Sequence, residues 1–222
     1  MRRSTGVFLT IFILVLISSS SALYAWWNED GEPISKASGT QIRPRIANDG
    51  EGGAIVTWYD NRNSDFDIYT QRIDVTGTVQ WYINGEHFCG ASGDQYNPAI
   101  VADGAGGAII AWEDLRNGNY DIYAGLVDAA GTSPWTLWGE AICTATGTQE
   151  KPSIISDGAG GAIITWEDNR GSDYDIYAQR IDGLGSVLWT VQGVGVCSAS
   201  GDQRDPQIIP DGAGGAIITW GD

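Results

Sequence analysis

A chain of 222 residues that is 42% apolar can build a hydrophobic core, which excludes a disordered protein. Its 31 glycines and 10 tryptophans indicate many tight turns between aromatic strands, so the composition favours an all-β fold over a helical one. The net charge of −16 gives a surface that repels phosphate, and we therefore expect no nucleic-acid partner.

Residues 1–25 have the order of a secretory signal peptide. Arg2 and Arg3 precede an apolar run at 7–17, and small residues follow it up to the cleavage positions Ala22 and Ala25. The run has 11 residues, and a spanning helix needs about 20. The sequence predicts export to the periplasm, the cell surface or the medium, with no stable membrane span after cleavage. The alternative is a leader that is kept as an anchor.

The rest of the chain, 26–222, repeats one phrase. The phrase begins at Asp49, Asp103, Asp157 and Asp211, each 54 residues after the one before, and in its third copy reads DGAGGAIITWEDNRGSDYDIYAQRID. A constant period of this size indicates one supersecondary unit repeated in an array. The units are 27–80, 81–134, 135–188 and a partial fourth unit, 189–222.

Each unit is predicted to contain four strands, which in the third unit are 152–157, 162–166, 175–182 and 186–189. An Asp-Gly turn separates the first two strands. The second strand, AIITW, is apolar on both faces, as expected of a strand between two neighbouring sheets. The predicted fold is an all-β propeller of four-stranded antiparallel blades. A linear β-solenoid is the alternative, although its repeats are shorter than 54 residues.

The predicted propeller is incomplete, because the fourth unit ends after its second strand, giving about 3.6 units. Propellers usually have about 4 to 8 blades and must close. We therefore expect a C-terminally truncated product, or closure by further blades or by another chain.

The loop that follows the second strand carries most of the polar residues. Several carboxylates there offer calcium the oxygen ligands it prefers. The competing interpretation is an ion pair in which arginine ties the loop to an aspartate. The calcium candidates are Asp60, Asp65, Asp67, Asp168, Asp173 and Asp175, and the structural candidates are Asp114, Arg62, Arg116 and Arg170.

The second strand of each unit ends in tryptophan, at Trp58, Trp112, Trp166 and Trp220, which we expect in the core. Tyr69, Tyr123, Tyr177 and an unrepeated Trp138 are candidates for stacking on sugar rings. Residues that occur once per unit are expected to hold the units together, because one active site needs one asymmetric set. The units differ at a few positions, such as the single histidine His87, but these positions do not supply a recognisable pair of nucleophile and base. No catalytic residue is therefore predicted.

The third unit contains, in order, an Asp-Gly turn, a strand, the phrases W-E-D-N-R and D-I-Y, and a second turn. This order resembles the TolB-type (WD40-like, PD40) propeller repeats, and more loosely the sialidase-like BNR propellers. The resemblance covers all units and implies a propeller. The TolB pattern has Ser-Pro before Asp-Gly, where this chain has Ile-Ser or Ile-Pro. The sialidase Asp-box, S-x-D-x-G-x-T-W, does not occur, so no sialidase catalytic residue is transferred.

These features predict a non-catalytic, exported propeller that serves as a binding or scaffold module at the cell surface or in the envelope, with a protein or glycan as ligand. No cofactor is expected apart from calcium in the loops. The alternative is a fragment of a glycan-processing propeller enzyme whose catalytic residues lie in missing blades.

Overall fold

A computed structural model describes residues 30–222, and every regular element in this range is a β-strand. The predicted signal peptide, 1–25, lies outside the described residues. Between residues 30 and 222 there is no helix of the length and apolarity that crossing a bilayer requires.

The strands form three four-stranded sheets and one two-stranded sheet, all antiparallel and each in chain order. We call the sheets blades 1, 2 and 3 and the partial blade. Blade 1 contains β1 (Gln41–Asn48), β2 (Ala54–Asn63), β3 (Asp65–Ile73) and β4 (Glu86–Cys89). Blade 2 contains β5 (Gln95–Ala102), β6 (Ala108–Asp114), β7 (Asp121–Val127) and β8 (Glu140–Cys143). Blade 3 contains β9 (Gln149–Ser156), β10 (Ala162–Asp168), β11 (Asp175–Ile181) and β12 (Val194–Cys197). The partial blade contains β13 (Arg204–Pro210) and β14 (Ala216–Gly221).

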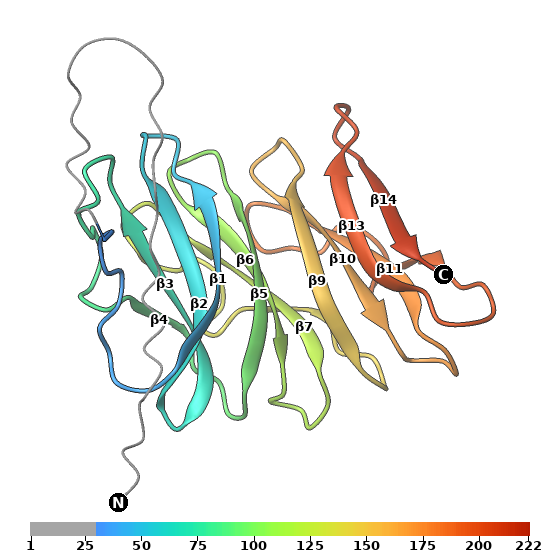
Figure 1. Cartoon of the computed structure of the whole chain (residues 1–222). Coiled ribbons are helices and arrows are strands. Elements are labelled where there is room, and N and C mark those ends of the chain that lie inside the picture. The colour runs from blue at the N-terminus through green and yellow to red at the C-terminus, as the bar shows by residue number, and fades with distance from the viewer. Residues whose placement is uncertain (1–29) are drawn as a thin grey trace, which may run out of the picture.

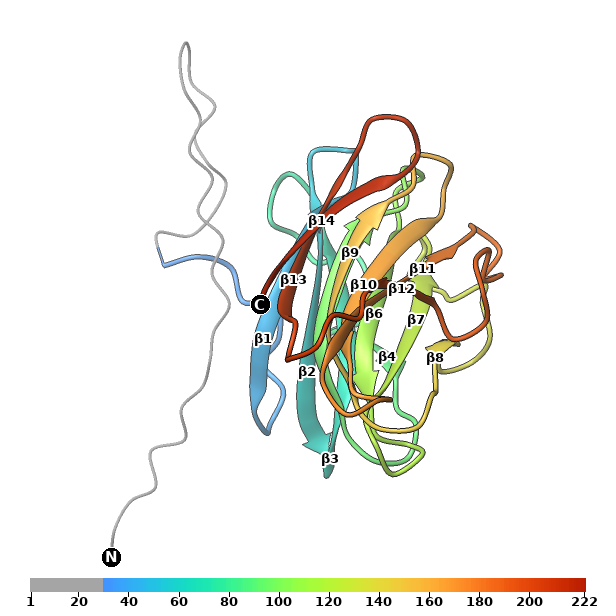
Figure 2. The same ribbon diagram turned by 90° about the vertical axis from the view of Figure 1, so that its right-hand side faces the viewer.

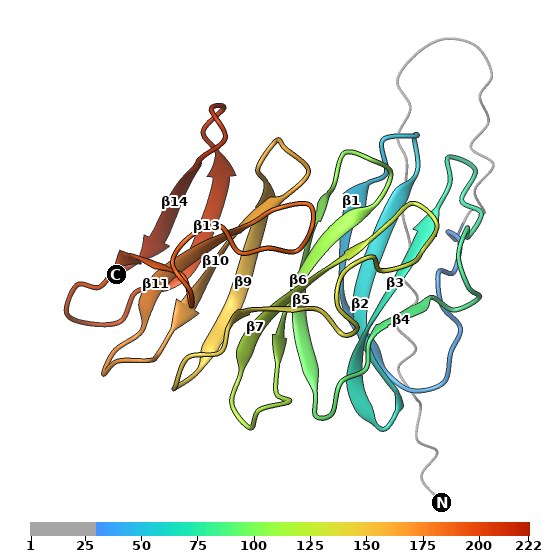
Figure 3. The ribbon, with the colours of Figure 1, turned by 180° about the vertical axis from the view of Figure 1, so that it is seen from behind.

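The blades stand side by side in chain order, so that the first strands β1, β5, β9 and β13 follow one another along one side of the molecule (Figure 1). Seen end-on, the first strands lie on one side and β8 on the other (Figure 2). The view from behind shows the third strands β3, β7 and β11 (Figure 3). The predicted all-β propeller with four-stranded blades is confirmed, with three complete blades and a half-blade.

The Asp-Gly turn between the first two strands is closed by its own aspartate. In blade 3 the Asp157 carboxylate accepts the backbone N–H groups of Ala159 and Gly161 at 2.8 and 2.9 Å. Gly158 and Gly160 have φ of 75° and 86°, where a side chain would be strained. Arg180 on the third strand donates to the other carboxylate oxygen at 2.9 Å. The repeated DGxGG phrase therefore fixes the hairpin by hydrogen bonds within itself.

The fourth strand is not where the sequence placed it. The 186–189 segment makes only one isolated bridge, Val187 to Ile181, and the strand that completes blade 3 is β12. In blade 3 the Gln179 amide binds this segment instead, donating to the Thr190 carbonyl at 2.8 Å and accepting from the Trp189 N–H at 2.9 Å. These side-chain bonds hold the segment as a loop over the third strand. The three complete blades therefore end at Cys89, Cys143 and Cys197, and in blade 3 this is eight residues beyond residue 189, the predicted end of the fourth strand.

The core consists of layers between successive blades. Trp58, Trp112 and Trp166 are fully buried, as predicted, among isoleucines and alanines of the second and third strands. Trp220 differs, with 37% of its surface exposed, because β14 pairs only with β13 among the described residues. Burial on both faces of β6 and β10 shows that these strands are packed between neighbouring blades, as their unbroken apolar runs indicated.

Candidate functional site

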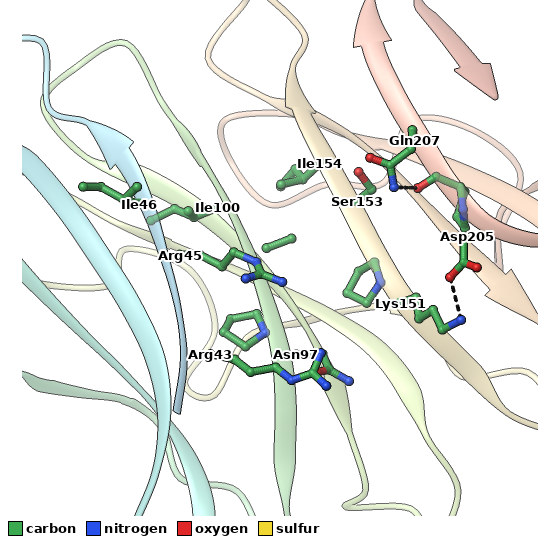
Figure 4. A pocket seen from close by; sticks show the side chains of 14 residues that line it. Arg43, Arg45, Ile46, Asn97, Ile100, Lys151, Ser153, Ile154, Asp205 and Gln207 are labelled. Carbon is green, nitrogen blue, oxygen red and sulfur yellow. Dashed lines mark hydrogen bonds and ion pairs between the residues drawn. The ribbon is translucent and has the colours of Figure 1, made fainter. Parts of the chain in front are cut away.

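The first strands of the four blades line an open groove of about 570 Å³, which we call the inner groove (Figure 4). Each blade contributes the residue before its proline and one or two residues after it, and all but blade 1 also contribute the proline. The lining residues are Arg43, Arg45, Ile46, Asn97, Pro98, Ala99, Ile100, Lys151, Pro152, Ser153, Ile154, Asp205, Pro206 and Gln207.

Each first strand is interrupted in this groove by a bulge at an X-Pro pair. In blade 1 the pairing passes from Ile42 opposite Tyr59 to Arg45 opposite Thr57, which leaves Arg43 and Pro44 out of the ladder. Proline cannot donate a ladder hydrogen bond, so a bulge is the natural place for it. The same shift occurs in the other three first strands.

The residue before the proline has a left-handed backbone in every blade. Arg43, Asn97, Lys151 and Asp205 have φ of 51°, 48°, 53° and 54°. For a residue with a side chain this conformation costs about 1–2 kcal/mol. Backbone strain of this kind persists where the surrounding structure enforces it, and it clusters at binding and catalytic sites. We call these four the bulge residues.

Buried glutamates hold the bulges from the preceding blade. Glu113 accepts the backbone N–H of Lys151 at 2.7 Å, and Glu167 accepts that of Asp205 at 2.6 Å. Glu113 also accepts from the Asn97 amide at 2.8 Å, so it contacts bulge residues of two blades. Burial raises the pKa of the Glu113 carboxyl above its usual value, although the bonds from Lys151 and Asn97 oppose this rise. Each glutamate therefore couples the inner groove to a blade interface.

The cations of the inner groove differ in how they are paired. Lys151 Nζ lies 2.7 Å from Asp205 and 3.0 Å from Glu167. The hydrogen bond to Asp205, with that to Glu167, raises the pKa of the Lys151 ammonium, which keeps it charged. Asp205 is the one carboxylate in the lining. Figure 4 shows the Arg43 and Arg45 side chains extending from β1 over β5 and ending short of the Lys151–Asp205 pair.

The predicted polar loops lie away from this groove's lining and are built around the buried tryptophans. The indole of Trp166 donates to Asp168 at 2.8 Å, and Arg170 forms an ion pair with the same carboxylate at 2.6 Å. Trp112 and Arg116 bind Asp114 in the same way, at 2.8 and 2.6 Å. Asp60 accepts from both Trp58 and Arg62. These carboxylates are 0% exposed, so they are enclosed within the blade.

The tyrosines proposed for sugar stacking are not available for it. Tyr69, Tyr123 and Tyr177 stack on the tryptophans with ring centroids 6.2 to 6.4 Å apart, and an arginine lies 3.8 Å over each ring. The sequence named them only as candidates for stacking on sugars and did not place them. It could not show that the arginine of the loop would fold back over the D-I-Y strand.

The cysteines belong to the same layer. Arg170 donates to Cys143 Sγ at 3.1 Å across the blade interface, and Arg116 donates to Cys89 Sγ at 3.5 Å. All three cysteines are unpaired, and burial raises the pKa of the Cys89 and Cys143 thiols to about 12. Both are therefore protonated thiols that pack between blades.

The remaining calcium candidates do not form one cluster. Asp65 is exposed, and the Asp173 carboxylate accepts the Gly201 N–H of the next repeat at 3.2 Å. Burial, together with the charges of Asp168 and Asp173, raises the pKa of Asp175. Within residues 30–222 no three His, Cys, Asp or Glu side chains are placed to hold a metal ion. Calcium binding by these loops stays a prediction, which thermal melting with and without calcium would test.

His87 has specific partners on the outer strand β4. Its Nε2 lies 2.9 Å from Asp67, its ring stacks on Tyr69 at 5.0 Å, and Trp138 of blade 2 lies 5.4 Å away. His87 and Trp138, the two unrepeated residues that the sequence singled out, therefore meet at the outer interface of blades 1 and 2. The inner groove lies along the first strands, at the opposite edge of each sheet.

Comparison with known proteins gives a likeness of fold. No protein-family model matches the chain. No curated protein sequence is similar to it either. Among solved structures, an endo-arabinase from Bacteroides thetaiotaomicron is similar with a TM-score of 0.53 at 16% identity, over 84% of this chain and 72% of that chain. The likeness agrees with the propeller arrangement, and at this identity it is one of fold alone.

Two further solved structures are similar over about half of their own length. A glycosyl hydrolase from Bacteroides ovatus has a TM-score of 0.43 at 10% identity, over 74% of this chain and 51% of that chain. A structure described with the GH130 family of mannoside phosphorylases and glycoside hydrolases has a TM-score of 0.43 at 11% identity, over 76% and 52%.

The bulge residues were missed in the sequence analysis, although a signal for them was present. Pro44, Pro98, Pro152 and Pro206 are constant at the 54-residue step, and the residue before each is Arg, Asn, Lys or Asp. A constant proline beside a variable polar residue indicates one backbone shape that presents different side chains. Periodicity alone could not show that these positions lie at a bulge.

Proposed function

We propose that this protein is a non-catalytic binding module whose inner groove binds a glycan. The observation that carries the proposal is the set of bulge residues, in which four strained backbones of one shape present four different polar side chains to one groove. Packing does not require this variety, since the prolines and buried glutamates hold the backbone. Variable side chains on a constant, rigid frame are typical of a recognition surface.

Export to the periplasm, the cell surface or the medium is part of the proposal and rests on the predicted leader at 1–25. A TolB-type relationship is also proposed, on the basis of the Asp-Gly and W-E-D-N-R phrases. A scaffold role with a protein ligand is the alternative within this class, and further blades or another chain would complete the ring.

Glycine variants test the binding proposal at positions whose positive φ glycine accepts. Arg43→Gly and Asn97→Gly remove a groove side chain and leave a residue that adopts this φ without strain. Ser64→Gly is the matched control, because Ser64 has φ of 100° but lies on the β2–β3 loop. On an oligosaccharide array, the wild type and Ser64→Gly should give the same pattern, and the groove variants should lose it. Equal patterns for all variants would exclude the groove as the site.

A glycan-processing enzyme is the second candidate, and the buried Glu113 with its raised pKa is the observation in its favour. Glycoside hydrolysis uses two carboxyl groups about 5 to 9.5 Å apart. The lining of the inner groove has one, Asp205, which is paired with Lys151. We therefore expect no release of reducing sugar from any glycan that binds. Release that disappears in Glu113→Gln would replace the binding proposal by the enzyme.

A further inference from the structure

The inner groove has a charge opposite to that of the whole protein. The chain carries a net charge of −16, but the groove lining holds Arg43, Arg45 and Lys151 against the single carboxylate Asp205. We propose that the ligand is an acidic glycan, whose carboxylate groups bind Arg43 and Arg45 on β1. This inference rests on the proposed function and names the chemical class of its ligand.

Only two of the three cations are free to bind a ligand. Lys151 is engaged by Asp205 and Glu167, at 2.7 and 3.0 Å. Within residues 30–222, the Arg43 side chain has no hydrogen bond or ion pair, and Arg45 Nη1 donates only to the carbonyl of its neighbour Pro44, at 3.4 Å. Both side chains are exposed. Their guanidinium groups therefore keep donors that a carboxylate can accept in pairs.

The fold itself does not require arginine at these positions. The equivalents of Arg43 are Asn97, Lys151 and Asp205, and the equivalents of Arg45 are Ala99, Ser153 and Gln207. The first strands of the other units form the same bulge, and the equivalents of Arg43 also have a positive φ. The arginine pair is thus peculiar to blade 1, where a local, asymmetric ligand contact explains it.

The bulge also explains why both arginines reach the groove. Because Arg43 and Pro44 are out of the ladder, the strand presents residues on either side of the proline to the same space. Figure 4 shows both guanidinium groups directed over β5, where the Arg43 side chain lies beside Asn97. Glu113 lies near enough for the Arg43 charge to lower its pKa, against the larger effect of burial, but its oxygens already accept from Lys151 and Asn97.

A polysaccharide fits this groove better than an acidic peptide. Successive blades offer one bulge residue each along the groove, as subsites at a regular step, and a polymer of repeating units can use several of them together. Beyond the arginines the polar lining consists of amides and a hydroxyl, from Asn97, Ser153 and Gln207, which suit sugar hydroxyl groups.

Calorimetric titration with oligogalacturonate, and with its uncharged methyl ester, tests the inference on the full chain. The ester has the same ring hydroxyls without the carboxylate charge. Wild type should bind the acid, more weakly as salt rises, and the ester at least about tenfold more weakly, the loss expected when charge-assisted pairs are removed. Arg43→Gln with Arg45→Gln should lower affinity for the acid to that for the ester. Lys36→Gln, which removes one positive charge at an exposed lysine outside the groove, should not.

The outcomes separate the inference from the proposed function. Equal binding of acid and ester by wild type, or unchanged binding by the double variant, would overturn the acidic class while leaving a glycan module. If an oligoglutamate of equal charge binds as tightly as the oligosaccharide in competition, the glycan would be overturned in favour of an acidic peptide. An absence of binding to these probes and to every glycan on the array would remove both proposals.

Discussion

The residue before proline in each first strand combines two conformational conflicts. Proline disfavours a helical backbone in the residue before it, and a positive φ brings Cβ close to the carbonyl oxygen. Arg43, Asn97, Lys151 and Asp205 nevertheless share a φ near 50°. The buried Glu113 and Glu167 compensate where they accept the backbone N–H groups of Lys151 and Asp205. Within residues 30–222, Arg43 and Asn97 have the same positive φ without a carboxylate that accepts their backbone N–H.

Substitutions at Arg43 should show a reversed order of stability. At an ordinary strand position, glycine is less stable than alanine by about 0.5–1 kcal/mol. At Arg43, with φ of 51°, alanine keeps the strain and glycine relieves it, so Arg43→Gly should be more stable than Arg43→Ala by about 1 kcal/mol. Urea unfolding of the two variants measures the difference. An alanine variant that is the more stable of the two would show that the left-handed backbone is absent in solution.

The buried aspartates of the tryptophan layer should be far less tolerant. Asp168 is 0% exposed and binds both the Trp166 indole and the Arg170 guanidinium. Asp168→Ala removes the carboxylate partner of the half-buried Arg170 and the acceptor of the buried Trp166 N–H, and we expect a loss of about 3–5 kcal/mol in unfolding free energy. Asp65→Ala, at the exposed first residue of β3, is the control and should change the unfolding free energy by less than about 0.5 kcal/mol. Similar melting temperatures for the two variants would contradict this assignment.

At the scale of the element, the Asp-Gly hairpin is a small self-contained unit. Asp157 and Asp49 close it through backbone N–H groups, and an arginine of the third strand binds each of them. Burial alone would raise the pKa of Asp157, but the hydrogen bonds from Ala159, Arg180 and Gly161 outweigh it and lower the pKa below its ordinary value of 3.8. Blade 2 forms the same hairpin with Leu126 in place of the arginine, so the arginine adds to a turn that already exists.

This arrangement predicts a specific acid dependence of stability. Because the folded pKa of Asp157 lies below its unfolded value, the stability that its charge contributes is present above about pH 4 and is lost as the pH falls through the folded pKa. Asp157→Asn should therefore flatten the fall of melting temperature between about pH 4 and 2. Arg180→Leu, which copies blade 2, should flatten it partly. Parallel profiles for wild type and Asp157→Asn would contradict the lowered pKa.

The elements that the sequence predicted correctly are those fixed by local chemistry. The DGxGG turn, the apolar second strand and the D-I-Y strand appear where the 54-residue pattern places them. The fourth strand was misplaced because β12 forms at 194–197, and in blade 3 the segment before it is bound through Trp189 and Thr190 by the Gln179 side chain. The inner groove was not foreseen for a similar reason, since the bulges of blade 3 and the partial blade are bound by glutamates from the preceding blade. Contacts between blades leave no periodic signal within a single unit.

At the scale of the whole molecule, the blades are held together by repeated contacts that differ in chemistry on the two sides. Toward the groove, Glu113 and Glu167 bind the next bulge, and toward the outer side Arg116 and Arg170 bind the cysteine of the blade before. Trp58, Trp112 and Trp166 fill the layers between. The partial blade receives the inner contact from Glu167, while Ile217 and Trp220 of β14 remain 53% and 37% exposed.

The exposed strand β14 predicts association of the 222-residue chain expressed by itself. A strand with an open edge and apolar side chains is a template for pairing with another chain. Ile217→Lys places a charge on this strand and should shift the protein toward monomer in light scattering and sedimentation. Arg43→Gln, far from this edge, should leave the association unchanged. A wild-type chain that is monomeric at high concentration would contradict the prediction.

The most direct test of the account is a crystal structure of the 222-residue chain grown with oligogalacturonate. The account predicts the sugar in the groove between β1, β5, β9 and β13, with a carboxylate against Arg43 and Arg45 and with all four bulge residues at positive φ. A sugar bound on the outer strands or on the β2–β3 loops, with the arginines of β1 untouched, would contradict it.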